Sequence, residues 1–191
     1  MIAVIGDNKT DYSADTMPWN IQTLNNNSSR VFGITLGKTS IQDAHQILSH
    51  FSETRLFSID NQLELRAHFE ELNLGGLLAE LDLVYELSQN SLSRIQKQAL
   101  TSSHDQYQLL PDQLLMSLLN TPVKKIIYKP VINYDEDQLA QRFGEASLRE
   151  NINETTEKFH YPDLGLLILL DTNGPEQFIY SYPETETTPE N

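Results

Sequence analysis

Cysteine is absent from this sequence of 191 residues, so the chain can form neither a disulfide nor a thiolate metal site, and it has no thiol nucleophile. Basic residues are scarce as well, because 13 lysines and arginines stand against 27 aspartates and glutamates and give a formal net charge of −14. The basic residues form no stripe of the kind that neutralises nucleic-acid phosphates. We therefore expect no nucleic-acid partner and no attraction to an anionic membrane surface.

Long apolar runs are also missing, since none approaches the ~20 residues that a transmembrane helix needs. The opening residues, MIAVIG, lack the basic region and the cleavage site of a signal peptide. We expect no direct membrane insertion by this chain. Two locations stay open: the cytoplasm, and a periplasmic or envelope-associated place if the chain belongs to a longer, anchored protein.

Alternation of apolar and polar residues predicts strands. Residues 63–70 and 77–85 alternate on either side of a Gly-Gly pair, which predicts an antiparallel hairpin. Residues 164–170 are all apolar or glycine, so we expect a strand with both faces covered, followed by a hairpin turn at 171–174. Further short strands are expected at residues 31–36, 107–110, 123–128, 155–161 and 177–182.

Apolar residues at helical spacing predict four helices. The first begins after Thr39 or Ser40, which can cap it, and runs to about His50, with Phe51 at the end of its apolar stripe. The other helices are expected at residues 91–100, 112–120 and 134–143.

This pattern predicts an α+β protein of two related units, each with a short helix or helices packed on a small antiparallel β-sheet. A chain of this length can bury a core of its own. The expected divisions are an irregular N-terminal arm at residues 1–30, a first unit with connecting helices at 31–120, a second unit at 121–183 and a disordered acidic tail at 184–191.

The second unit carries residues with a resemblance to a known group. The predicted helix closes with FGEA at residues 143–146, an aromatic strand with Lys158, Phe159 and Tyr161 follows, and the apolar run then ends in Asp171. This order resembles the modules of small bacterial envelope proteins, namely the outer-membrane assembly lipoprotein family SmpA/OmlA and the similarly folded β-lactamase-inhibitor proteins. Modules of that type place a helical pair on a small antiparallel sheet, often twice in one chain.

The resemblance covers residues 131–182 and, more loosely, 31–86. It implies binding rather than catalysis, and a place in the bacterial cell envelope.

Three motifs imitate functional sites but differ from them in spacing. Residues 33–39, GITLGKT, resemble a phosphate-binding loop but have three residues between the glycines where that loop has four. The five histidines show no metal-binding spacing, and the acidic triplet at 135–137 opens a helix, where acids stabilise the dipole. We therefore expect no catalytic residues, no cofactor and no metal.

Aromatic residues gather in the C-terminal part of the chain. Tyr128, Tyr161, Tyr180 and Tyr182 are our candidates for a partner-binding face, because tyrosine combines apolar area with a hydroxyl group. The alternative is that such rings form the core and cross-strand pairs.

We accordingly expect a non-enzymatic protein-binding or scaffold module of the bacterial cell envelope, with another protein as its partner. One alternative is a hydrolase of unrecognised type that uses carboxylates in a cleft between the units. The other alternative is the soluble extracytoplasmic part of a membrane-anchored protein.

Overall fold

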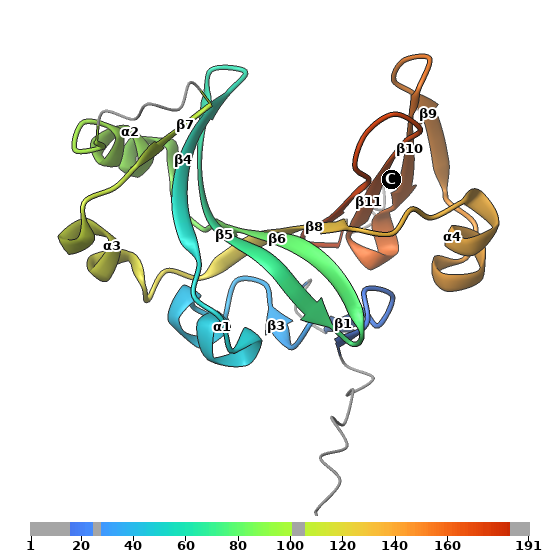
Figure 1. Cartoon of the computed structure of the whole chain (residues 1–191), viewed down its shortest axis with the longest axis horizontal. Coiled ribbons are helices and arrows are strands. Elements are labelled where there is room, and N and C mark those ends of the chain that lie inside the picture. Colours follow the sequence, from blue (N-terminus) through green and yellow to red (C-terminus); the bar gives the residue numbers. More distant parts are fainter. Residues whose placement is uncertain (1–15, 25–27, 101–105, 184–191) are drawn as a thin grey trace, which may run out of the picture.

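The computed structural model describes residues 16–24, 28–100 and 106–183, so residues 1–15 of the expected arm and the expected tail at 184–191 lie outside the described residues (Figure 1). The strands are β1 (Gln22–Leu24), β2 (Ser28–Val31), β3 (Ile34–Thr35), β4 (Glu53–Ile59), β5 (Gln62–Leu74), β6 (Leu77–Tyr85), β7 (Tyr107–Leu109), β8 (Val123–Pro130), β9 (Leu148–Asn151), β10 (Thr156–Tyr161), β11 (Leu166–Asp171) and β12 (Gln177–Tyr180). The helices are α1 (Ile41–Leu48), α2 (Gln89–Gln96), α3 (Asp112–Leu118), α4 (Glu136–Phe143) and the 3₁₀ helix η2 (Pro162–Leu164).

One antiparallel sheet of nine strands runs through both halves of the chain, in the order β7-β4-β5-β6-β8-β12-β11-β10-β9. The predicted hairpin is confirmed as β5 and β6, and the predicted C-terminal meander as β10, β11 and β12. Strand β8 joins the halves, because it pairs with β6 on one side and with β12 on the other. The α+β class is confirmed, whereas the origin of the halves as a repeat stays a prediction.

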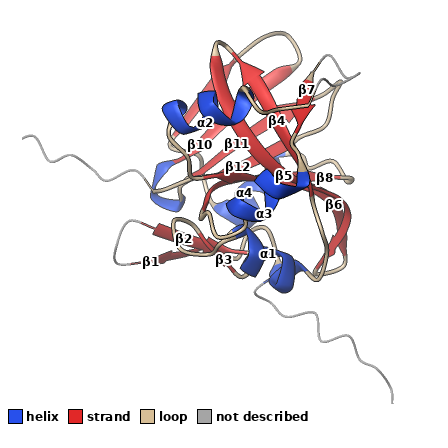
Figure 2. Ribbon diagram, turned by 90° about the vertical axis from the view of Figure 1, so that its left-hand side faces the viewer, coloured by secondary structure: helices blue, strands red, loops and turns tan. Residues whose placement is uncertain are grey.

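The large sheet bends into a U, and its two faces differ in what covers them (Figure 1). The four α-helices and the small sheet β1-β2-β3 lie on the outer, convex side, and no helix of the described residues lies inside the U (Figures 1 and 2). Side chains alternate between the faces. On β5, Leu65 and Ala67 are fully buried on the convex side, whereas Glu64 and Arg66 lie on the concave side.

Capping residues fix where two helices begin. Ser40 caps α1 and forms a capping box with Asp43, and Asp135 forms the same arrangement with Gln138 at the start of α4.

Helix α1 ends at Leu48, earlier than the sequence predicts. Ser49 adopts a left-handed conformation with φ 55°, which turns the chain away from the helix axis. Phe51 therefore does not join the apolar stripe of α1, and its side chain is 91% exposed.

Part of the expected irregular arm is folded, because β1 and β2 form a hairpin that continues into β3. The strand expected at residues 31–36 is interrupted by a turn at Phe32 and Gly33, with φ of 54° and 78°. This small sheet buries Val31 and Ile34 in the core, and it also buries Ser28, whose Oγ donates to the carbonyl oxygen of Leu36 at 2.6 Å. Strand β1 and the first residues of β2 are mostly polar, so apolar alternation does not mark them in the sequence.

Strands β4 and β9 are absent from the sequence-based prediction. All residues of the edge strand β9 are exposed, so no buried face marks it in the sequence. Strand β11 was expected to be covered on both faces, but this expectation is wrong. Leu166 and Ile168 are buried on the convex side, whereas Leu167 and Leu169 are half-buried on the concave side.

Candidate functional site

The concave side of the large sheet carries a network of ionisable side chains, which we call the concave cluster. They come from β4, β5, β6 and β8, because alternate residues of neighbouring antiparallel strands point to the same face. The members are Glu53, Arg55, Glu64, Arg66, His68, Glu70, Glu80, Asp82, Lys125 and Lys129.

Asp82 is the most deeply buried carboxylate of the concave cluster, with 2% of the residue exposed. Its Oδ1 lies 2.6 Å from His68 Nδ1, and its Oδ2 accepts from Lys129 Nζ at 3.1 Å and from Arg66 Nη1 at 3.5 Å. Burial by itself would raise the pKa of Asp82. The hydrogen bond with His68 and the charge and hydrogen bond of Lys129 outweigh burial and hold that pKa below its ordinary value.

Glu64 forms a second centre of the concave cluster. Its Oε1 lies 2.5 Å from Lys125 Nζ, and its Oε2 lies 2.5 Å from Arg66 Nη2. Burial opposes the charged carboxylate, but the hydrogen bond from Lys125 and the charges of Arg66 and Lys125 lower the pKa of Glu64. Arg66 contacts both Glu64 and Asp82, so it links the two centres.

Two arginines of the concave cluster lie over aromatic rings. The guanidinium carbon of Arg66 is 4.6 Å from the centre of the Phe57 ring, and that of Arg55 is 4.7 Å from the centre of the Tyr107 ring. The two rings are themselves 5.8 Å apart. Cation–π contacts of this kind add to the ion pairs, so the arginine side chains are fixed in one arrangement.

Three carboxylates of the concave cluster, those of Glu53, Glu70 and Glu80, reach further into solvent than its cations do, whereas Asp82 and Glu64 do not. The side chains of Glu70 and Glu80 are 69% and 53% exposed, whereas those of Arg55 and Arg66 are 17% and 14% exposed. The exposed Phe51 ring lines the same hollow as Glu70 and Arg55. The accessible part of the concave cluster is therefore acidic, with an aromatic ring beside it.

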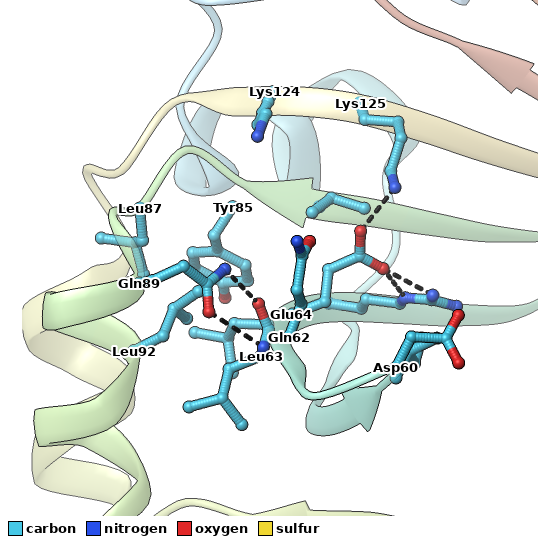
Figure 3. Close-up of a pocket in the computed structure, with 14 residues that line it drawn as sticks. Asp60, Gln62, Leu63, Glu64, Tyr85, Leu87, Gln89, Leu92, Lys124 and Lys125 are labelled. Atoms are coloured by element: carbon cyan, nitrogen blue, oxygen red, sulfur yellow. Dashed lines mark hydrogen bonds and ion pairs between the residues drawn. The ribbon is translucent and has the colours of Figure 1, made fainter.

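A pocket of about 410 Å³ lies beside the concave cluster, between the start of β5, the end of β6, the start of α2 and β8 (Figure 3). Gln89 fixes one wall, because its side-chain amide accepts from the backbone nitrogen of Leu63 at 3.0 Å and donates to the Leu63 carbonyl oxygen at 2.9 Å. Lys125 also lines the pocket and pairs with Glu64. Lys124, the neighbouring residue, lies on the pocket side of β8 in Figure 3.

The structure places three of the four candidate tyrosines in the core. Tyr128 and Tyr180 are 0% exposed, and Tyr161 is buried as well. The ring of Phe32 packs against the rings of Tyr128 and Tyr180 at 5.3 and 5.7 Å. The expectation of an exposed tyrosine face is corrected at these positions, because strand alternation directs the three rings to the convex, core side.

Tyr182 is partly buried and fastens the C-terminal end of the described chain to the first half. Its hydroxyl donates to Glu86 Oε1 at 3.0 Å, and burial together with Glu86 raises the pKa of Tyr182 to about 12. Gly37 lies against this hydroxyl, because a Cβ added there would be 2.6 Å from Tyr182 Oη. Tyr182 is thus placed in an internal contact rather than on an open face.

Sequence reasoning missed the concave cluster although one signal for it was present. The alternation of β5 already placed Glu64, Arg66 and His68 on a polar face. Their partners Asp82 and Lys129 become recognisable once the register of β5, β6 and β8 is known, since His68 is directly opposite Asp82.

Within the described ranges, no group of three or more histidine, aspartate or glutamate side chains is placed to hold a metal ion. No helix in this part of the chain is both long enough and apolar enough to cross a membrane.

Comparison with known proteins identifies no relative, since no protein-family model, no curated protein and no solved structure matches the chain. The resemblance to the SmpA/OmlA family and to the β-lactamase-inhibitor proteins therefore stays a prediction from the sequence.

Proposed function

We propose that this chain is a non-enzymatic protein-binding module that holds its partner on the concave side of the large sheet. The observation that carries the proposal is the position of the concave cluster, on the face of a nine-stranded sheet that the helices leave open (Figure 1). The exposed Phe51 ring stands at the edge of this face. Aromatic rings beside charged groups are typical of residues that dominate binding energy.

The ion pairs beneath the surface support the proposal because they hold the concave side in one shape. Asp82 and Glu64 each bind at least two cationic side chains, and Arg66 belongs to both groups. A satisfied polar network of this kind is rigid. A rigid face loses little conformational entropy when a partner binds, which favours affinity.

The partner that fits this face is a protein with a basic surface. Glu53, Glu70 and Glu80 expose their carboxylates, while the cations below them are already paired. The net charge of −14 attracts a basic partner at long range. A lysine or arginine of the partner would pair with Glu70 while its aliphatic stem packs on Phe51.

The hydrolase alternative draws on the hydrogen-bonded pair of His68 and Asp82, since such pairs occur in general-base catalysis. Here, however, His68 is buried, and its second ring nitrogen, Nε2, lies 3.5 Å from Glu70 Oε1. Both ring nitrogens are thus directed at carboxylates. That arrangement suits a structural ion-pair network better than proton transfer to a substrate.

The place in the bacterial envelope follows from the sequence resemblance, and we keep it as part of the proposal. Fractionation of the source cells, with an antibody against the chain, tests it. Recovery in the cytosolic fraction alone would contradict the envelope location without bearing on the binding face.

The binding face is tested by affinity capture from an extract of the source cells with three baits. These are the unaltered protein, the double variant Phe51→Ala/Glu70→Lys, and the control Glu154→Lys, which makes the same charge change at the exposed β9–β10 turn on the other arm of the U. Bound proteins are quantified by mass spectrometry over a series of salt concentrations.

We expect a basic protein to bind the unaltered bait and the Glu154 variant and to be released by salt. Loss of the Phe51 and Glu70 contacts together costs about 3 kcal/mol, so the double variant should recover roughly a hundredfold less. Both altered side chains are exposed, but Glu70 also pairs with Arg55 at 3.2 Å, so the melting temperature should fall by no more than about 2–4 °C and the circular dichroism spectrum should stay that of the folded protein. Equal recovery by all three baits would place the binding surface elsewhere.

A further inference from the structure

The pocket beside α2 differs in charge from the rest of this acidic protein. Arg66, Lys124 and Lys125 line it together with Asp60 and Glu64. Glu64 is already bound to both Arg66 and Lys125, so these three side chains neutralise most of their own charge. Within the part of the chain that the structure describes, Lys124 makes no ion pair and no side-chain hydrogen bond. One cation of the lining, Lys124, is therefore available to a ligand.

Part of the lining of this mostly polar pocket is apolar. Val84 and Leu92 line it and are buried, and Leu63 and Leu87 are half-buried side chains that pack on the core around it. A ligand that covers these leucines gains roughly 25 cal/mol for each Å² of apolar surface removed from water.

The walls of the pocket are fixed before any ligand arrives. Gln89 ties α2 to β5 through its two hydrogen bonds with the Leu63 backbone. Tyr85 also lines the pocket, and its hydroxyl lies 3.1 Å from Thr54 Oγ1. The volume of about 410 Å³ falls within the range of about 300–1,000 Å³ that is usual for small-molecule sites.

We propose that this pocket binds a small organic monocarboxylate, whose carboxylate pairs with Lys124 and whose apolar body lies on Leu63 and Leu87. The single unpaired ammonium group matches one negative charge. Asp60, on the same lining, repels a second negative charge, which disfavours phosphate monoesters and other dianions. The lining of the pocket includes neither Phe51 nor Glu70, the proposed partner contacts, so the two proposals can be tested independently.

The test uses 4-phenylbutyrate as the probe and follows the backbone amide signals of the ¹⁵N-labelled full chain by NMR. We expect saturable shifts at Leu63, Leu87 and Gln89, with a dissociation constant of about 1 mM or below. The uncharged probe 4-phenylbutyramide should bind the unaltered protein at least about tenfold more weakly, because it cannot pair with Lys124.

Two variants test whether Lys124 is the cation that pairs with the carboxylate of the ligand. Lys124→Gln should weaken the binding of 4-phenylbutyrate at least about tenfold. Lys38→Gln changes an exposed lysine outside the pocket and should leave the dissociation constant for 4-phenylbutyrate unchanged. Shifts that fail to saturate, or equal binding by the Lys124 variant, would overturn the proposal. Tighter binding of phenyl phosphate than of 4-phenylbutyrate would overturn the assignment to monocarboxylates. No partner protein enters the measurement, so its failure leaves the protein-binding proposal untouched.

Discussion

Replacement of Asp82 by asparagine removes the central negative charge of the concave cluster while it keeps the shape of the side chain. The buried carboxylate holds His68 at 2.6 Å and Lys129 at 3.1 Å. Hydrogen bonds to charged groups contribute about 1.5–3 kcal/mol each. The loss of two such bonds would lower the free energy of unfolding by about 3–6 kcal/mol before any rearrangement.

Rearrangement places the expected loss at the lower end of that range. Lys129 is partly exposed and lies 3.9 Å from Glu80, so it can pair there, and Arg66 keeps its contact with Glu64. We therefore expect Asp82→Asn to lower the free energy of unfolding by about 3 kcal/mol at pH 7. For a chain of this size, such a loss lowers the melting temperature by about 6–12 °C.

The effect of Asp82→Asn should depend on pH in a fixed direction. Because the folded-state pKa of Asp82 is lowered, its stabilisation is fully present above the unfolded-state pKa of about 3.9 and is lost as the pH falls through the folded-state pKa. The difference between the unaltered protein and the variant is thus complete at pH 7. It should shrink progressively below about pH 4.

Urea unfolding followed by circular dichroism at pH 7 and at pH 3 measures the loss in free energy of unfolding and its dependence on pH. Glu80→Gln is the matched control, because it also removes one carboxylate charge from the concave cluster, and we expect it to cost less than about 0.5 kcal/mol since Glu80 is exposed. A loss below about 1 kcal/mol for Asp82→Asn at pH 7, or a difference that does not change with pH, would refute the assignment of Asp82 as the centre of the network.

Three further substitutions test the core and the C-terminal contact by urea unfolding. Tyr180→Phe removes a buried hydroxyl that donates to a backbone carbonyl oxygen at 2.9 Å, so it should cost about 1 kcal/mol, and an unchanged stability would contradict that bond. Gly37→Ala places a Cβ at a φ of 73° and 2.6 Å from Tyr182 Oη, so it should cost about 1–3 kcal/mol, with a smaller cost in a Tyr182→Ala background. Burial raises the pKa of Glu176, so its ionised form weakens the fold; Glu176→Gln should stabilise the protein at pH 8, and this gain should vanish below about pH 4.3. A gain that persists at low pH would assign the effect to packing instead.

The elements with local signals could be predicted from the sequence. Strand β5 alternates strictly from Leu63 up to a β-bulge between Phe69 and Leu72, and β6 alternates from Ala79 to Leu83. The caps at Ser40 and Asp135 lie at the starts of their helices. These signals depend on neighbouring residues alone. The end of α1 was missed because Ser49 turns left-handed, a conformation that serine seldom adopts.

The burial of the tyrosines could have been predicted more sharply from β8. In this strand Lys125, Ile127 and Lys129 share one face, whereas Ile126 and Tyr128 share the other. The face without lysines is the one that suits a core, which places Tyr128 inside. The concave cluster itself could not be predicted, because it depends on the pairing of β6 with β8, strands that are separated in sequence by two helices and by β7.

The concave side therefore consists of an inner layer of paired charges and an outer layer of exposed groups, and the two layers have separable effects. Removal of the inner Asp82 charge should destabilise the fold, because its partners lose a buried counter-ion. Reversal of the outer Glu70 charge removes a partner of Arg55 at 3.2 Å, so it should cost about 1 kcal/mol or less, and it alters the sign of the surface that a partner meets. Glu53 and Glu70 both pair with Arg55, yet their side chains are 48% and 69% exposed, so they belong to the network and also present negative charge to solvent beside the exposed Phe51. Under the binding function that we propose, the shape of this face is fixed by the buried ion pairs, and a basic partner would meet the exposed carboxylates and Phe51.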